Sequence, residues 1–180
     1  LQKPSSHQAG LGNPANLESR LFQDLAAFAN LASSLSGASP KESLERALDI
    51  LREATGAEAA EVFLAEPGGK GMVLACHRGL FRHAFSHGAW FSRGEGFPGL
   101  VLATGNPALS EHLQEDPRYL RRRVKELGFR RYLCVPLKAP QGIVGTIGLA
   151  FRRTDFEMSQ ALALASWASA PLGLAVQAGL

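Results

Sequence analysis

The chain has 180 residues, of which 46% are hydrophobic, and its formal net charge is +3. This length and apolar content predict one folded domain with its own core. The charge is too small for a dedicated nucleic-acid-binding surface, and no apolar run approaches the roughly 18 residues that a membrane-spanning helix needs. Cys76 and Cys134 lie far apart in apolar stretches, which indicates reduced core thiols and a cytoplasmic location.

The first 16 residues are rich in Gly, Pro, Ser and Asn and predict a flexible lead or linker. They lack the apolar centre of a signal peptide. Because the chain begins with Leu1 and not Met, we expect a fragment of a longer protein that carries an output domain. Residues 17–180 are expected to form a single domain with flanking helices.

Residues 17–35 predict a helix whose apolar side chains follow 4-3-4-3 spacing and form one stripe. The stripe packs either on the core or in a dimer seam, and its spacing leaves both open. The candidates for a dimer interface, one of them in the last helix, are Leu21, Leu25, Phe28, Leu35 and Trp167.

A second helix is predicted from strong capping signals. Ser39 is its N-cap, Pro40 takes the first helical position, Glu42 completes a capping box and Gly56 ends the helix. Two strands follow at 59–66 and 72–78 as a hairpin.

The middle of the chain predicts short elements. A strand is expected near 89–92, within a loop rich in aromatic residues, and a helix is expected to begin at Pro98 and end at Gly105. Residues 106–110 are predicted to be extended. A further helix is expected to be capped by Asp116, to begin at Pro117 and to close at Gly128.

The end of the chain predicts a second hairpin and a long helix. Strands are expected at 131–137 and 143–151, the latter central in the sheet because it has few polar residues. Thr154 and Glu157 form a capping box that predicts a helix over 155–177. Pro171 predicts a kink or an early end near Ser169. Antiparallel hairpins with helices packed on them define an α+β fold.

Four segments in the right order resemble the GAF domain family. They are the turn and helix G-E-G-F-P-G-L-V-L-A-T-G, the D-P-R-Y start at 116–119, the terminal hairpin Y-L-C-V-P-L and I-V-G-T-I-G-L-A, and the first core strand A-A-E-V-F-L-A. The resemblance extends over about 17–177. It implies a GAF-like, PAS-related central antiparallel sheet of five or six strands with helices on both faces.

The resemblance also implies a function. Such domains serve as sensors in bacterial signalling proteins such as histidine kinases and transcription regulators. Their first and last helices often form a homodimer interface, and a small-molecule pocket lies on the opposite face. By strand alternation and position, the pocket candidates are Trp90, Phe91, Phe97, Val101, Arg121, Tyr132, Cys134 and Thr146.

Residues 118–131 hold seven basic side chains and one acidic side chain. Most of these arginines are expected to point to solvent, since Val124 and Leu127 need burial, and Arg121 is retained as a candidate anion contact. Direct nucleic-acid binding is not expected, because no reading helix accompanies the segment.

The histidines do not predict a metal site. Cys76 and His77 are neighbours on a strand and point to opposite faces, so both cannot bind one ion. The cofactor is unknown, and a haem bound through His77 or the following loop stays open, as some GAF sensors bind haem.

Three functions are compatible with these sequence features. The leading one is a non-enzymatic sensor that binds a small molecule and dimerises through its terminal helices, with no membrane contact. The second is a structural dimerisation module without a ligand. The third is an enzyme similar to free methionine-(R)-sulfoxide reductases, which is disfavoured because the 94–99 loop lacks cysteine.

Overall fold

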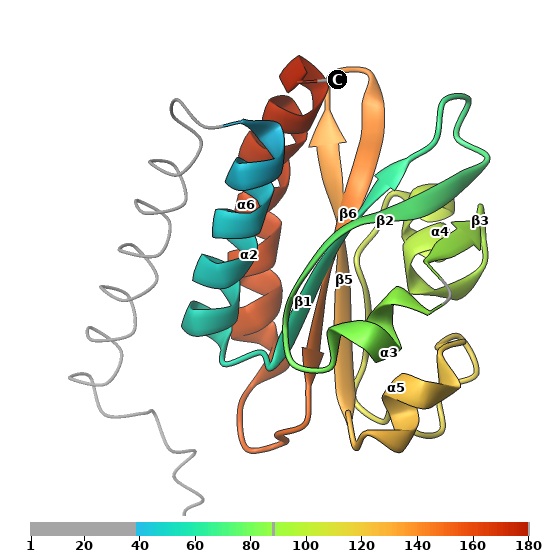
Figure 1. Ribbon diagram of the computed structural model, residues 1–180, viewed down its shortest axis with the longest axis vertical. Coiled ribbons are helices and arrows are strands. Elements are labelled where there is room, and N and C mark those ends of the chain that lie inside the picture. Colours follow the sequence, from blue (N-terminus) through green and yellow to red (C-terminus); the bar gives the residue numbers. More distant parts are fainter. Residues whose placement is uncertain (1–38, 88, 180) are drawn as a thin grey trace, which may run out of the picture.

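A six-stranded antiparallel sheet with the strand order β3-β2-β1-β6-β5-β4 forms the centre of the molecule (Figure 1). The computed structural model describes residues 39–87 and 89–179. The strands are β1 (Ala59–Ala65), β2 (Gly71–Gly79), β3 (Trp90–Ser92), β4 (Ala108–Ser110), β5 (Arg131–Ala139) and β6 (Gly142–Phe151). The two predicted hairpins are confirmed, and β6 is central as expected. The predicted lead over 1–16, the helix over 17–35 and the dimer candidates Leu21, Leu25, Phe28 and Leu35 lie outside the described residues.

Two long helices, α2 (Pro40–Thr55) and α6 (Met158–Gly179), cover one face of the sheet side by side (Figure 1). The predicted capping box of α2 is present. The Ser39 hydroxyl accepts from the Glu42 amide at 3.3 Å, and the Ser39 amide donates to Glu42 Oε2 at 3.1 Å. Gly56 ends the helix in the left-handed conformation with φ 71°, which explains the glycine there.

The last helix differs from its prediction at both ends. It begins at Met158 and not near Asp155, so Thr154 is exposed and does not cap it. It also continues past Pro171 to Gly179, and the predicted early end near Ser169 is wrong. Packing on β5 explains the continuation, since the Ser169 hydroxyl donates to the Pro136 carbonyl. A Cβ on Gly173 would lie only 2.1 Å from the Lys138 carbonyl oxygen.

By length and composition α6 could cross a membrane, but its position in the fold is that of a core helix. Its apolar face is buried against β5 and α2, through Leu164, Ala168 and Leu172 among others. These contacts explain its composition without a bilayer.

Three short helices cover the other face: α3 (Arg82–Ser86), α4 (Gly96–Thr104) and α5 (Arg122–Glu126) (Figure 1). The 79–93 loop was not predicted to contain α3, whose N-terminal boundary is Phe81 at the unusual φ of 57°. Gly105 ends α4 as predicted, in the left-handed conformation.

The predicted helix from Pro117 to Gly128 is wrong over its first half. Asp116 makes a turn instead, because its Oδ1 accepts from the Arg118 backbone amide at 2.9 Å. The Arg118 guanidinium, which also hydrogen-bonds the carboxylate, lowers the pKa of Asp116 to about 2. Only residues 122–126 are helical, so Arg121 lies before the helix and not on its face. This shift directs the Arg121 side chain into the protein.

Candidate functional site

A row of four residues in register crosses the sheet beneath the short helices. His77 on β2 pairs with Glu61 on β1, Glu61 pairs with Gly148 on β6, and Gly148 pairs with Cys134 on β5. Glu61 is therefore near the middle of the sheet and only 1% exposed. A carboxylate at such a position needs a cation or several hydrogen-bond donors.

Arg121 supplies the opposite charge from the covering layer. Its Nη1 donates to Glu61 Oε2 at 2.7 Å, and its Nη2 donates to Glu61 Oε1, which makes a two-pronged ion pair. Nη1 also donates to the Phe85 carbonyl at 3.2 Å, and Nη2 contacts the Tyr119 hydroxyl at 3.1 Å. One guanidinium thus joins β1, the C-terminal part of α3 and the segment before α5.

Tyr132 completes the coordination of the carboxylate from β5. Its hydroxyl donates to Glu61 Oε1 at 2.7 Å. The side chain reaches Glu61 across Gly148, where an added Cβ would lie 2.1 Å from the Tyr132 hydroxyl oxygen and 3.0 Å from Glu61 Cγ. Burial, together with the Glu61 charge, raises the pKa of Tyr132 well above its ordinary value. The phenol therefore stays a donor.

Aromatic rings surround the guanidinium of Arg121. The rings whose centroids lie between 5.0 and 5.7 Å from its Cζ are those of Phe63, Phe85, Phe91 and Tyr119. Burial alone lowers the pKa of Arg121, but the Glu61 charge raises it. The resulting pKa lies well above the ordinary value. The arginine remains charged in a largely apolar environment, which is the setting in which cation–π contacts are strongest.

The cluster is not fully satisfied. Among the described residues, Nε of Arg121 and both ring nitrogens of His77 are buried without a hydrogen-bond partner. An unpaired buried donor costs about 1–3 kcal/mol. His77 packs on Phe85 with ring centroids 4.7 Å apart, and burial lowers the pKa of His77 to about 4. Its imidazole is therefore neutral at pH 7.

The structure brings together seven of the eight pocket candidates. Phe91, Phe97, Val101, Arg121, Tyr132, Cys134 and Thr146 are all buried on this side of the sheet. Phe97 contacts both Tyr119 and Tyr132 edge to face. Trp90 does not belong with them: it is half exposed on β3, and its indole nitrogen donates to Glu66 Oε2 at 2.9 Å.

Sequence reasoning missed Glu61, His77 as its strand neighbour, and Tyr119. Alternation in the 59–66 strand sets Glu61 on the face opposite Val62 and Leu64, but it does not predict a partner for the carboxylate. The available signal was an acidic residue in a strand whose remaining residues are apolar or small, A-A-E-V-F-L-A, since a charge within a buried strand implies a partner.

The two cysteines lie on opposite faces of the sheet. Cys76 packs in the core beneath α2 and α6, whereas Cys134 packs with Tyr132 and Phe97 beneath the short helices. Burial raises the pKa of Cys76 to about 12, and burial raises the pKa of Cys134 as well. Neither thiol is poised as a nucleophile, and the sheet separates them from each other.

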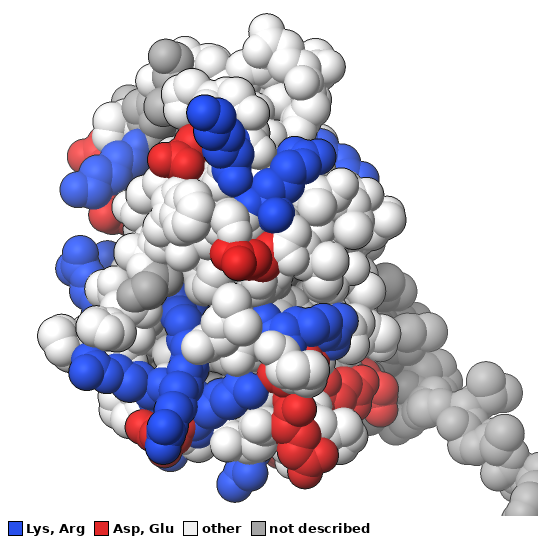
Figure 2. All heavy atoms as spheres, turned by 90° about the vertical axis from the view of Figure 1, so that its right-hand side faces the viewer, with Lys and Arg blue, Asp and Glu red and all other residues white. Residues whose placement is uncertain are grey.

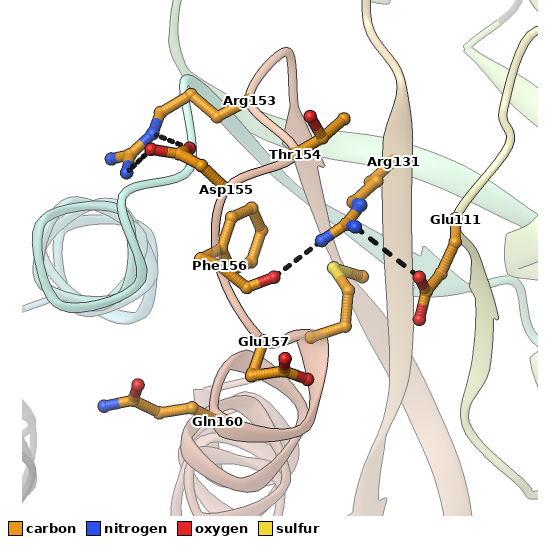
Figure 3. Close-up of a pocket in the computed structure, with 9 residues that line it drawn as sticks. Glu111, Arg131, Arg153, Thr154, Asp155, Phe156, Glu157 and Gln160 are labelled. Atoms are coloured by element: carbon orange, nitrogen blue, oxygen red, sulfur yellow. Dashed lines mark hydrogen bonds and ion pairs between the residues drawn. The ribbon is translucent and has the colours of Figure 1, made fainter. Parts of the chain in front are cut away.

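Two surface hollows are relevant to ligand binding, one on this side of the molecule and one at the start of α6. One, of about 430 Å³, opens between α3 and α5 and is lined by Ala84, His87, Leu120, Arg121, Arg122, Arg123 and Glu126. The other, of about 540 Å³, lies between β5 and the start of α6 (Figure 3). Arg131 crosses that second hollow, donating to the Phe156 carbonyl at 2.7 Å and lying 3.5 Å from Glu111 (Figure 3). Arg131, the cation that crosses the second hollow, is thus already engaged by Phe156 and Glu111 within the protein.

The described residues form no metal site, and the face of His77 is covered in this arrangement. Within residues 39–87 and 89–179 no three His, Cys, Asp or Glu side chains gather as a metal site would require. The only histidine in the cluster, His77, has the Phe85 ring against its face, so haem could reach it only if α3 moved.

The architecture defines a class: an antiparallel sheet with paired long helices on one face and short helices and loops over a polar cluster on the other. Within that class, the family model for the GAF domain matches residues 37–177. The chain belongs to the GAF domain family.

Solved structures agree on the fold. The GAF domain of A. aeolicus nlh2 in an inactive state is 17% identical with a TM-score of 0.74, covering 88% of this chain and 98% of that one. The GAF domain of a phosphoenolpyruvate-protein phosphotransferase (ptsP) from Coxiella burnetii is 19% identical with a TM-score of 0.75, covering 87% and 94%. Free methionine-R-sulfoxide reductase from Neisseria meningitidis, solved with its substrate, is 18% identical with a TM-score of 0.71, covering 94% of each chain. A comparison with curated protein sequences gave no match.

Proposed function

We propose that this chain is a non-enzymatic sensory domain of a bacterial signal-transduction protein in the cytoplasm. It binds a small molecule on the face covered by α3, α4 and α5, and it forms a homodimer through its terminal helices. Membership of the GAF family and the structural likeness to the GAF domains of nlh2 and of a phosphoenolpyruvate-protein phosphotransferase support this proposal.

The observation that carries it is the buried ion pair of Glu61 and Arg121. A buried ion pair often stabilises a protein no better than well-packed apolar side chains of the same volume. Among the described residues, Arg121 Nε and both ring nitrogens of His77, the strand neighbour of Glu61, are buried without a hydrogen-bond partner. Unpaired polar groups beneath short helices indicate a place selected for recognition and not for stability.

The sheet offers a route for the signal. Glu61 lies on β1, whose alternate side chains, such as Ala60 and Val62, point to the other face and pack in the core beneath α2 and α6. A ligand that binds one arrangement of the covering layer more tightly than another shifts the population of that arrangement. We expect such a shift to reach α6, which exposes Trp167 and Leu174 on its outer side.

A second function, a structural dimerisation module without a ligand, is favoured by the aromatic filling of the cluster. Phe63, Phe85, Phe97 and Tyr132 are at most 1% exposed, so the space under the short helices is largely occupied by the protein itself.

The enzymatic alternative has less support. The likeness to methionine sulfoxide reductases is one of fold, and Cys76 and Cys134 are buried on opposite faces. Activity on free methionine sulfoxide that disappears in a Cys76→Ser, Cys134→Ser variant would establish this third function in place of the proposed one.

A thermal-shift series separates the sensor from the structural module. The full chain is heated with nitrate, small carboxylic acids, nucleotides and haem in turn. A ligand at 100 times its Kd raises the free energy of unfolding by about 2.7 kcal/mol. A shift with one of these supports the sensor, and no shift with any of them favours the structural module.

Dimerisation is tested by sedimentation of the full chain and of its Trp167→Glu, Leu174→Glu variant. We expect a dimer for the first and a monomer for the second, because two charges on an apolar interface oppose association. Monomers in both samples would contradict the proposed dimer.

A further inference from the structure

The hollow between α3 and α5 has a lining that combines arginines with a small apolar wall. Arg121, Arg122 and Arg123 contribute the cations, Ala84 and Leu120 contribute the apolar surface, and Glu126 is the single acid. Its volume of about 430 Å³ is in the usual range for pockets that bind small molecules.

Among the residues that the structure describes, two of the three arginines in this lining are paired with a carboxylate, and the third is not. Glu126 is engaged by Arg122 Nε at 2.8 Å, and Arg121 is engaged by Glu61. Within the described part of the chain, no ion pair or side-chain hydrogen bond is found for Arg123, and its side chain is exposed. The hollow therefore keeps one cation without a counter-charge beside two that are already paired.

The wider surface has the same character. Figure 2 shows Lys and Arg side chains gathered on the face that carries the short helices, with Asp and Glu interspersed among them. Near the hollow, α3 contributes Arg82 and α5 contributes Arg122, Arg123 and Lys125. A positive field over a hollow attracts small anions.

We propose that this hollow binds a small organic anion, with a carboxylate or phosphate group held by Arg123 and Arg121 and an apolar portion resting on Ala84 and Leu120. This inference rests on the proposed sensory function and specifies its ligand class. Guanidinium groups suit both anions because their N–H donors match two oxygens at once.

Arg121 gives the hollow its connection to the rest of the domain. It lines the hollow, yet only 5% of its side chain is exposed, and it holds Glu61 on β1 and the Phe85 carbonyl on α3. An anion drawn to Arg121 either takes the Nε donor, which has no partner among the described residues, or competes with Glu61 for the Nη donors. Binding at the surface thereby changes the contacts of β1 and α3.

The test is isothermal titration of the full chain at low ionic strength. The probes are inorganic phosphate, succinate and, as a neutral control of the same shape as succinate, its diamide. We expect at least one of the two anions to bind, and the diamide to bind at least tenfold more weakly than succinate if succinate binds. If only phosphate binds, the natural ligand carries a phosphate group. If only succinate binds, it carries a carboxylate.

Two variants in the hollow locate the site, and a third on the far side of the sheet is the control. Arg123→Gln should weaken anion binding by about three- to tenfold, as expected for one exposed cation. Arg46→Gln, an exposed arginine on α2 across the sheet, removes the same charge and should leave affinity unchanged. Arg121→Lys keeps the charge beside Glu61 but loses the planar fork, and should weaken binding by at least tenfold, with circular dichroism confirming that the variant folds.

The inference is overturned if neither anion binds, or if Arg123→Gln binds as tightly as the unmodified chain. A neutral compound that binds under the short helices while both anions fail would overturn the anion site and leave the sensory function standing. No binding by any class of compound would count against both.

Discussion

At the scale of single residues, Glu61 and Arg121 set the character of this domain. Their ion pair is almost completely buried, and its hydrogen bonds extend to Tyr119, Tyr132 and the Phe85 carbonyl. Removing one charge leaves the other uncompensated in an apolar environment, whereas removing both relieves the desolvation penalty. We therefore expect the coupling free energy between Glu61 and Arg121 to be larger than the net contribution of the pair to stability.

Arg121→Met should lower the free energy of unfolding by about 3–5 kcal/mol, because it strands the Glu61 carboxylate. The double variant Arg121→Met, Glu61→Leu should recover most of that loss. Urea unfolding of Arg121→Met, of Glu61→Leu and of the double variant gives the coupling free energy between the two residues.

The exposed pair Arg122 and Glu126 provides the control. Arg122→Met should change stability by less than about 0.5 kcal/mol, since the pair is solvated. If the double variant at 61 and 121 is no more stable than Arg121→Met, the two buried charges are not energetically coupled.

His77 should make stability depend on pH. Burial lowers its pKa to about 4, below the ordinary value of about 6.5. The folded state then binds fewer protons than the unfolded chain between pH 6.5 and 4. Stability is fully present above this window and falls as the pH decreases through it, by up to about 3 kcal/mol.

NMR titration of the His77 ring measures this pKa directly, and acid unfolding of His77→Phe should show a smaller loss of stability between pH 6.5 and 4. A His77 resonance that titrates near pH 6.5 would contradict the burial argument.

At the scale of elements, the features predicted from sequence are those that depend on neighbouring residues. The capping box of Ser39 and Glu42 and the glycine ends at Gly56 and Gly105 are present because each is a short-range hydrogen-bond or backbone requirement. The helix expected from Pro117 fails because Asp116 has a competing local option, a turn closed on the Arg118 amide. Capping residues and turn residues are chemically the same set.

The contact between α6 and β5 gives a prediction of unusual sign. Replacing a helical glycine with alanine usually stabilises a helix by about 0.5–1 kcal/mol. At Gly173 we expect a loss of about 1–3 kcal/mol instead, because the new Cβ would lie 2.1 Å from the Lys138 carbonyl oxygen.

Thermal unfolding of Gly173→Ala measures the effect. Ser166→Ala, on the exposed side of the same helix, should stay within about 0.5 kcal/mol of the unmodified chain. A Gly173→Ala variant as stable as the unmodified chain would show that α6 does not approach β5 this closely.

At the scale of the whole molecule, the sheet separates two environments. Cys76 belongs to the core under α2 and α6, and Cys134 to the cluster under the short helices. Both thiols have raised pKa values through burial. Neither should react with a thiol reagent at pH 8 in the folded protein, and both should react once guanidinium unfolds the chain.

A rapid reaction of either thiol in the folded protein, or a disulfide joining them, would contradict this arrangement and revive the enzymatic alternative. The control is the chain unfolded in guanidinium and treated with the same reagent. Both of its two thiols should react.

The candidate site was only partly predictable, for a physical reason. Alternation on the last hairpin correctly placed Tyr132 and Cys134 on one face, and Arg121 was singled out by its charge. Glu61, its partner, lies 60 positions earlier, and only the pairing of β1 with β6 brings it opposite Gly148. A salt bridge of that separation leaves no periodic signal in a single sequence.

In the proposed sensor, the covering layer responds to a bound anion through Arg121. Hydrogen–deuterium exchange of the full chain, with and without saturating phosphate or succinate, measures this response. We predict slower exchange in 82–86 and 119–126, the segments that Arg121 joins, with α2 unchanged. Identical exchange throughout, or protection confined to α2 and the far side of the sheet, would contradict the claim.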